Sequence, residues 1–360
     1  MRVVIIAASA HPIAEPFAGG LESLTWQLVR GLRGCGVDVT LFAGPGSDPR
    51  LGATTLDVSP LSLSAAARRD VSMVPERWLR AHHAYLQVML ALQRRNDVSV
   101  VHNNSLHHLP VVMADSLAIP MVTTLHTPPT PWLEPAIGIA SGSPNSLHRN
   151  RFVAVSAYTA RQWSHVTAAD VIPNGVDVRR WSAGPGGTEL AWVGRIVPEK
   201  APHRAVAMAR AAGRGLRIAG PIGDRAYFDR HLAPLLGAGV DYVGHLDTDS
   251  LAALVGTSSA TLVTPEWDEP YGLVAAESLA CGTPVVALDR GGLREFVVPG
   301  TGVLLDRGVS AAEAAESVEQ ATRLDRTACR DHAVSACSVE RMVEDYLRLY
   351  ESLVTLPGAA

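Results

Sequence analysis

Two glutamates separated by seven residues, Glu269 and Glu277, enclose the stretch EPYGLVAAE. The apolar run ATLVTP before this stretch is typical of a buried strand, and the run LVAAESLACG predicts a helix. Free backbone N–H groups at a helix start favour an anion, so the amides of Tyr271, Gly272 and Leu273 form a candidate anion site. An acidic helix start explains one carboxylate in the first turn only. Glu277 lies deeper in the apolar run and needs a partner, so we expect both glutamates to bind hydroxyl groups of an elongated ligand.

The loop GRIVPEK, from Gly194 to Lys200, places two cations after the predicted strand ELAWV. Arg195 offers a fork of hydrogen-bond donors and Lys200 offers a point charge, a combination that suits a diphosphate. Cations usually lie on solvated faces, but the glycine and the proline of this loop favour a bound anion.

Gly19 and Gly20 end the loop after the first predicted strand and open a helix. They either bring the backbone close to an anionic ligand or form an ordinary tight turn, and the sequence leaves both interpretations open. The pattern differs from GxGxxG, and Phe42 and Ala43 stand where a nicotinamide-binding protein carries an acid for the ribose. A nicotinamide-dependent oxidoreductase is therefore disfavoured.

Several histidines and acids invite a metal interpretation. His11 follows the first strand, and His102, His107 and His108 belong to the run HNNSLHH, which has neither the i, i+4 spacing of zinc ligands nor a nearby carboxylate. We interpret them as loop histidines on the side that receives a second substrate. The acids of the run DTDSLAALV, residues 247–255, are interpreted as a loop and a helix cap. We expect no metal site.

Composition describes a folded protein of two domains. The chain has 360 residues, more than the roughly 250–300 at which single cores stop growing. A hydrophobic content of 47%, a charged content of 18% and a net charge of -4 leave no basic surface for nucleic acid. No apolar run approaches the ~20 residues of a membrane span. The four cysteines lack CxxC spacing, so we expect a reducing cytoplasm.

Apolar runs alternate with helical stretches in both halves of the chain, which predicts two doubly wound parallel sheets, each covered on both faces. The predicted strands are RVVIIAA, VDVTLFA, VSVVHNN, PMVTTLH and RFVAVS, then ELAWVGR, GLRIAGP, VDYVGH, ATLVTP and TPVVAL. We predict a first domain over 1–172, a Pro- and Gly-rich linker over 173–188 and a second domain over 189–339. An amphipathic helix over about 340–356 packs either on the second domain or back on the first.

Ligands of such sheets bind at the carboxyl ends of the strands, and the motifs found there resemble one family. EPYGLVAAE is similar to the E-x7-E signature of family 4 retaining glycosyltransferases of the GT-B fold, which have two Rossmann-like domains facing a cleft. The runs TTLHTPP, IPNGVD, VGRIVPEKAP and ACGTPVVALDRGGLRE follow in the expected order. Within the family, AGPIGDRAYFDRHLAPLL looks most like the subgroup that contains an avilamycin-biosynthesis glycosyltransferase. The resemblance covers nearly the whole chain.

The resemblance implies a role for each motif. Arg195 and Lys200 would clamp the diphosphate of a nucleotide-sugar donor, Glu277 would hold the ribose, and Glu269 would hold the transferred sugar. His126 would reach the sugar near the reacting carbon. The candidate catalytic residues are Arg195, Lys200, Glu269 and His126. The candidate donor-binding residues are Gly19, Gly20, Gly194, Gly220, Gly244, His245, Leu246, Tyr271, Gly272, Leu273, Val274 and Glu277, with 244–246 beside the nucleobase.

The resemblance also implies the reaction. We expect a retaining hexosyl- or pentosyltransferase that needs no metal or other cofactor, favours a UDP-sugar over a GDP-sugar, and uses attack from the face that the diphosphate leaves. A small molecule, a glycan or a lipid-linked hydroxyl would be the acceptor, and a homodimer is possible. A nucleotide-sugar epimerase and a non-catalytic sugar-nucleotide-binding protein on the same fold stay open as alternatives.

Overall fold

The computed structural model describes residues 1–58, 60–141 and 150–355 and contains two parallel sheets. The first sheet has seven strands in the order β3-β2-β1-β4-β5-β6-β7. Its strands are β1 (Arg2–Ile6), β2 (Asp38–Ala43), β3 (Thr54–Thr55), β4 (Val100–Asn103), β5 (Met121–Leu125), β6 (Asn150–Ala154) and β7 (Ala169–Val171). All five strands predicted for this half are present, and the short edge strands β3 and β7 were not predicted.

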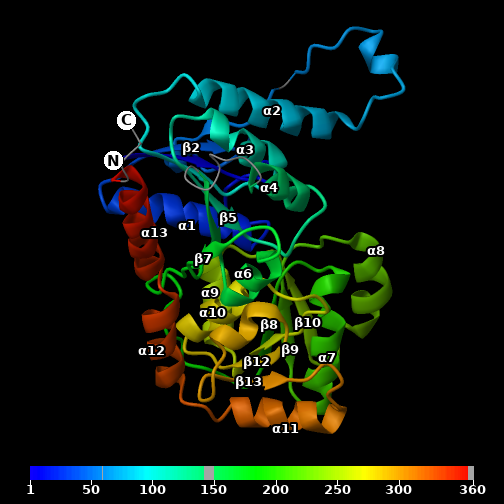
Figure 1. Ribbon diagram of the computed structural model, residues 1–360. Helices are drawn as coiled ribbons and strands as arrows, with labels where there is room; N and C mark the ends of the chain where they lie inside the picture. Colours follow the sequence, from blue (N-terminus) through cyan, green and yellow to red (C-terminus); the bar gives the residue numbers. More distant parts are fainter. Residues whose placement is uncertain (59, 142–149, 356–360) are drawn as a thin grey trace.

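The second sheet has six strands in the order β10-β9-β8-β11-β12-β13. Its strands are β8 (Leu190–Val193), β9 (Leu216–Ala219), β10 (Val240–Gly244), β11 (Ala260–Val263), β12 (Val285–Leu288) and β13 (Gly302–Leu305). Only β13, at the edge, was not predicted. The two sheets confirm the fold class of two Rossmann-like domains, and Figure 1 shows them one above the other.

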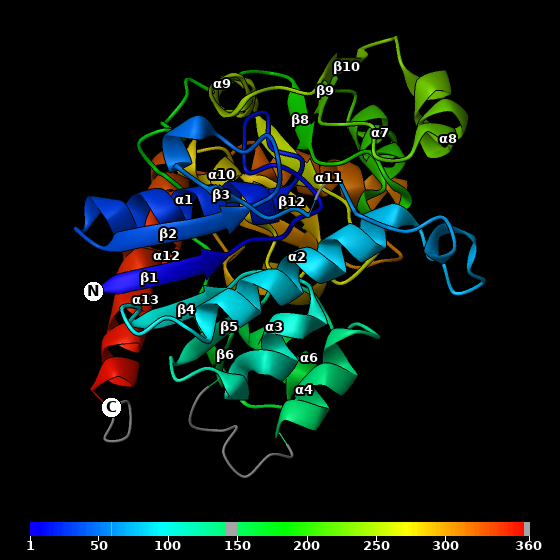
Figure 2. The same cartoon turned by 90° about the horizontal axis from the view of Figure 1, so that it is seen from above.

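Helices cover both sheets, as the alternating pattern predicted. They are α1 (Gly20–Gly34), α2 (Glu76–Leu92), α3 (His108–Met113), α4 (Leu133–Ser141), α6 (Ala157–Trp163), α7 (Pro202–Ala211), α8 (Arg225–Tyr227), α9 (Thr248–Gly256), α10 (Leu273–Ala280), α11 (Ala311–Ala321), α12 (Arg326–Cys337) and α13 (Val339–Val354). Viewed from above, α2, α3 and α4 lie along one flank of the first sheet (Figure 2). None of the described helices combines the length and the apolar composition that a membrane crossing requires.

The C-terminal helix α13 packs on the first domain, although α12 before it belongs to the second. Met342, Val343, Tyr346, Tyr350 and Leu353 share one buried cluster with strands of the first sheet. In Figure 1 α13 lies beside α1. The chain therefore crosses back after α12, and α13 packs over the first sheet.

A buried polar network fixes α13 to the first sheet. The Tyr350 hydroxyl lies 2.5 Å from His102 Nδ1, and His102 Nε2 lies 2.8 Å from the Thr124 hydroxyl. That hydroxyl also lies 3.0 Å from the Tyr346 hydroxyl. Burial lowers the pKa of His102 to about 3, so the ring is neutral. The prediction that His102 is a loop histidine was wrong, because it is a fully buried residue of strand β4. Its partners Thr124 and Tyr350 come from β5 and from α13, which are distant in the sequence.

Tyr350→Phe tests this network. The change leaves His102 Nδ1 buried without a partner, and we expect the free energy of unfolding to fall by about 1–3 kcal/mol. Urea denaturation followed by circular dichroism measures the loss. Glu351→Ala, at an exposed position of the same helix, is the control and should change stability by no more than about 0.5 kcal/mol. Equal stability of the two variants would contradict the proposed anchoring.

Candidate functional site

A cavity of about 470 Å³ lies between the two domains. Loops that follow β1, β5, β8, β9, β10 and β11 line it, so the carboxyl ends of both sheets face the same space. All the candidate catalytic and donor-binding residues named from the sequence line this cavity, except Gly244. They are Gly19, Gly20, His126, Gly194, Arg195, Lys200, Gly220, His245, Leu246, Glu269, Tyr271, Gly272, Leu273, Val274 and Glu277.

Two helix N-termini meet at this cavity. Helix α1 begins at Gly20 in the first domain, and α10 begins at Leu273 in the second. The helices approach so closely that a Cβ on Gly20 would lie 3.5 Å from the Leu273 side chain. Each N-terminus carries unpaired N–H groups and a partial positive charge. The arrangement can bind an anion from both sides.

Arg195 and Lys200 add two full positive charges to the same space. The Arg195 side chain is 45% exposed, and among the described residues it pairs with Glu199, at 3.8 Å. Its donors are therefore available to a ligand. Lys200 instead contacts the buried carboxylate of Glu269 directly.

Glu269 is held in place through one oxygen atom. Oε1 receives the Lys200 ammonium group and the Trp267 indole N–H, at 3.1 Å in the second case. No described residue hydrogen-bonds Oε2. Since the cavity lies beside this side chain, Oε2 can accept a hydrogen bond from a ligand hydroxyl group while Oε1 keeps its protein partners.

The first domain supports the loop that carries Glu269. The Ser156 and Thr159 hydroxyls, at the start of α6, donate to the Pro270 carbonyl at 2.5 and 3.1 Å. The Tyr158 hydroxyl donates to Asp268 at 2.7 Å. The candidate site is therefore braced across the domain boundary, and the position of Glu269 depends on the relative placement of the domains.

Glycines allow the two strand ends β8 and β9 to approach each other beneath the cavity. A Cβ on Gly220 would lie 1.9 Å from the Gly194 carbonyl oxygen, so no larger residue fits there. Gly244 supports the site from behind, because its carbonyl accepts from the Gly220 N–H at 2.8 Å. His245, next in sequence, contacts the Phe17 carbonyl of the first domain through Nε2 at 2.9 Å.

His126, at the end of β5, is a neutral ring. Burial lowers its pKa to about 3. Its Nε2 lies 2.7 Å from Asn104 Oδ1, and because an amide oxygen only accepts, Nε2 carries the proton. Nδ1 is then a hydrogen-bond acceptor at the wall of the cavity.

Glu277 is a buried carboxyl group whose pKa is raised. It lies 8% exposed within α10, and no described residue donates a hydrogen bond to its carboxylate. Burial raises its pKa to about 8. An unpartnered acid at the wall of a cavity is prepared for hydroxyl donors from a ligand.

Several residues of the cavity were not identified from the sequence. Glu22, in the first turn of α1, is buried and lines the cavity, as do Asn174, Trp181 and Thr248. Glu22 carried a weak signal, since it follows the Gly19-Gly20 turn by two residues. Thr248 and Arg180 both bind Glu15 of the first domain, a contact that no local pattern indicates.

The acids of the DTD run do not form a metal site with each other. The Asp247 side chain accepts from the Ser250 N–H at 2.8 Å and caps α9, which begins at Thr248. The Asp249 carboxylate binds the Arg180 guanidinium at 2.6 Å. This confirms the interpretation as a helix cap.

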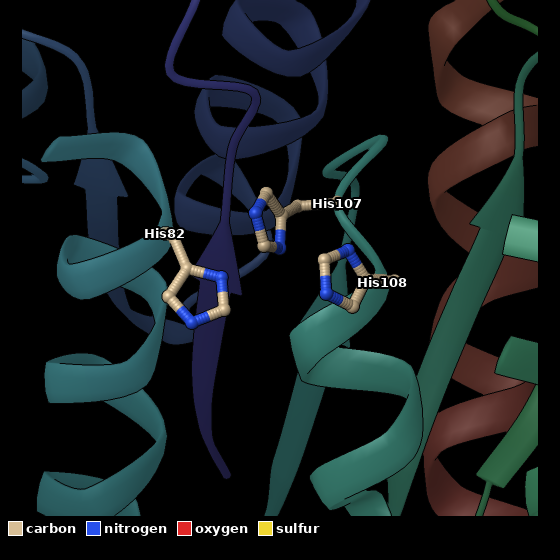
Figure 3. Close-up of side chains that lie close together, drawn as sticks. All are labelled: His82, His107 and His108. Atoms are coloured by element: carbon tan, nitrogen blue, oxygen red, sulfur yellow. The ribbon is translucent and has the colours of Figure 1, made fainter. Parts of the chain in front are cut away.

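Two of the remaining histidines gather outside the cavity. His107 and His108 stack on each other with ring centroids 4.4 Å apart at the start of α3, and His82 of α2 lies beside them (Figure 3). The neighbour His82 was missed because it lies 25 positions earlier. Burial lowers the pKa of His107 to about 3 and lowers that of His108. His11 lines the cavity.

Known proteins share this architecture. Residues 18–180 match the sequence model of "Glycosyltransferase Family 4", and residues 180–333 match that of "Glycosyl transferases group 1". A D-inositol 3-phosphate glycosyltransferase of Gordonia bronchialis is 30% identical over 358 residues, which cover 84% of this chain and 77% of the relative. A glycogen synthase of Mycobacterium tuberculosis is 28% identical over 349 residues, which cover 84% and 82%.

Solved structures show the same fold. AviGT4, a glycosyltransferase of avilamycin A biosynthesis, superposes with a TM-score of 0.71 over 98% of each chain at 22% identity. Anabaena HepE, solved in complex with UDP-glucose, superposes with a TM-score of 0.72 over 98% of this chain and 100% of its own at 17% identity.

Two Rossmann-like domains with a cavity between them are the architecture of the GT-B fold, which AviGT4 shares. The sequence relationship narrows the class, and the chain belongs to glycosyltransferase family 4. Its activity is the transfer of a sugar.

Gly291→Ala tests how the loop of Glu269 is supported. Gly291 has φ +66, and a Cβ there would lie 2.1 Å from the Glu269 carbonyl oxygen. Gly300, with φ +92, has no atom within 4 Å of such a Cβ, so Gly300→Ala is a matched control for backbone strain. We expect Gly291→Ala to lose about 1–3 kcal/mol more stability than the control in urea denaturation. Equal losses would show that the loop tolerates displacement.

Proposed function

We propose that the protein transfers a sugar from a UDP-sugar to a hydroxyl acceptor with retention of configuration and without a metal ion. The observation that carries the proposal is the convergence of two helix N-termini, Arg195 and Lys200 on one cavity between the domains. A donor diphosphate placed there meets the N-termini of α1 and α10 and the side chains of Arg195 and Lys200. Anabaena HepE, a protein with the same fold, was solved with UDP-glucose, which supports the choice of nucleotide.

Stabilisation of the leaving diphosphate is the main catalytic contribution in this proposal. Negative charge grows on the diphosphate as the bond to the sugar breaks, and fixed donors act most strongly on charge that develops in the transition state. Arg195 donates directly. Lys200 has three N–H donors, so it can keep Glu269 and still donate to a phosphate oxygen.

The same placement assigns the remaining side chains. The sugar lies beside Glu269 Oε2, which accepts from one of its hydroxyls, and beside Nδ1 of His126, which accepts from another. The ribose lies at Glu277, and the base borders His245 and Leu246. The acceptor hydroxyl approaches from the face that the diphosphate leaves, and a departing phosphate oxygen accepts its proton. The acceptor is a small molecule, a glycan or a lipid-linked alcohol.

Binding and turnover test the proposal together. In EDTA, UDP should raise the melting temperature more than GDP, ADP or dTDP, since a ligand at 100 times its Kd adds roughly 2.7 kcal/mol of stability. Arg195→Ala should lower kcat by about 10²–10³ with the fold intact, because no buried group pairs with Arg195. Donor hydrolysis or transfer from UDP-sugars, followed by liquid chromatography, measures the rate.

Arg225→Ala is the matched control for this loss. Arg225 pairs with Asp229 at 2.9 Å on an exposed surface outside the cavity lining, and its removal should leave kcat unchanged. A near-normal rate for Arg195→Ala would remove the diphosphate clamp from the proposal. An absolute requirement for Mg²⁺ or Mn²⁺ would contradict the metal-independent route.

The two glutamates should respond differently to amide substitution. Glu277→Gln should weaken the binding of free UDP, since the ribose is held equally before and during the reaction. Glu269→Gln should lower kcat and change the choice of sugar while UDP still binds. Calorimetry measures the Kd and product formation measures kcat. Weaker UDP binding by Glu269→Gln, with normal binding by Glu277→Gln, would show that the donor lies in the reverse orientation.

The pH dependence of UDP binding adds a second measurement for Glu277. Its pKa is raised to about 8 from an ordinary 4.5, so in the free protein the group is protonated below pH 8. Ribose hydroxyls donate best to the carboxylate, so UDP binding should strengthen as pH rises toward 8 and level off above it. In the Glu277→Gln variant, the pH dependence of UDP binding should reflect only the titration of the nucleotide. Without ligand, the raised pKa makes the free energy of unfolding fall as pH rises from about 4.5 to 8, because the folded protein binds more protons than the unfolded chain in this range.

A further inference from the structure

Three histidines from two separate elements meet on the first domain (Figure 3). His82 belongs to α2, His107 precedes α3 and His108 begins it. One ring nitrogen of each lies within 4.8 Å of the other two, and all three residues are partly buried. None of the three lines the cavity between the domains, although Leu106, next to His107, does. Glycosyl transfer therefore leaves the cluster without a role.

Packing against aromatic side chains holds two of the rings in place. His107 stacks on Tyr85 of α2 with ring centroids 4.5 Å apart, and the buried Tyr85 hydroxyl donates to the Ala7 carbonyl at 3.0 Å. His108 stacks on Trp132 at 5.3 Å with an angle of 21° between the planes. The cluster is thus part of a layer of stacked rings beside α2 and α3.

The ring nitrogens of the cluster have few protein partners. No described residue hydrogen-bonds a ring nitrogen of His82 or His108, and no described carboxylate pairs with them. The one bond is long: the Leu109 N–H donates to His107 Nδ1 at 3.2 Å. Neutral imidazoles with free lone pairs are preferred ligands of Zn²⁺, Cu²⁺ and Ni²⁺.

We propose that His82, His107 and His108 bind a divalent transition metal ion of the zinc class outside the transfer site. Three protein ligands around such an ion leave a fourth position for water or for an anionic or hydroxyl ligand. Tetrahedral Zn–N bonds of about 2.0–2.1 Å place the ligand nitrogens about 3.3 Å apart. The rings reach this spacing by side-chain rotation, and ligation through His107 Nδ1 replaces a single long hydrogen bond.

Titration of the full chain with metal salts tests the proposal. The protein is prepared without a histidine tag, stripped with EDTA and dialysed. Calorimetry with ZnCl₂ should give one ion per chain. CoCl₂ should produce the visible absorption of a cobalt ion with nitrogen ligands, and CuCl₂ should quench tryptophan fluorescence, because Trp132 stacks on His108.

Matched variants decide whether these three residues hold the ion. His82→Ala should weaken Zn²⁺ binding at least about tenfold. His83→Ala is the control and should bind as the wild type does, because its ring Nδ1 already bonds the Leu79 carbonyl at 2.7 Å. His107→Asn keeps a capping side chain at the start of α3 and should lose Zn²⁺ with an unchanged melting temperature.

Two results would overturn the proposal. The first is the absence of Zn²⁺ binding by the wild type, which would leave the cluster a packing feature only. The second is undiminished binding by His82→Ala or His107→Asn, which would place the ion elsewhere. UDP binding should be the same with and without Zn²⁺, so a failure here leaves the proposed transfer site untouched.

Discussion

The close approach of Gly20 in α1 to Leu273 in α10 is the contact on which the rest of the site depends. It brings two helix N-termini from different domains to one point, and neither domain alone provides that field. Unpaired N–H groups of two helices repel each other weakly when no anion lies between them. Other contacts between the two domains must therefore hold the two helix N-termini close to each other, and the structure has three sets of them.

Each support joins the domains through groups that tolerate little displacement. Helix α13 buries aromatic side chains of the C-terminal segment against the first sheet. The start of α6 holds the Pro270 carbonyl. Glu15 holds both Arg180 and Thr248. Pro270 and Thr248 also line the cavity, so two of these contacts hold its wall directly.

Charge in the cavity is balanced in a way that leaves room for an anion. Lys200 is paired with Glu269, and Glu277 is protonated below pH 8 because burial raises its pKa. The other charged side chains that line the cavity are Arg195, which has Glu199 3.8 Å away, and the buried Glu22. In the proposed function, a diphosphate lies beside Arg195 and the two helix N-termini, and the Lys200–Glu269 pair stays intact.

How far the sequence predicts this molecule depends on how local each feature is. Strand-to-helix loops are local, so the fold and the charged and glycine-rich residues of the cleft were predictable from runs such as GRIVPEK and EPYGLVAAE, whereas lining residues such as Glu22, Trp181 and Thr248 were not. Edge strands β3 and β7 have only two and three residues, and their patterns are too brief to detect. The amphipathic stripe of α13 shows that it packs but not on which domain. His82 meets His107 and His108 only because α2 and α3 are neighbours in space, and no spacing in a single segment encodes that contact. Contacts between distant segments are thus where sequence reasoning ends, and here they include both the support of the Glu269 loop by α6 and the histidine cluster outside the cavity.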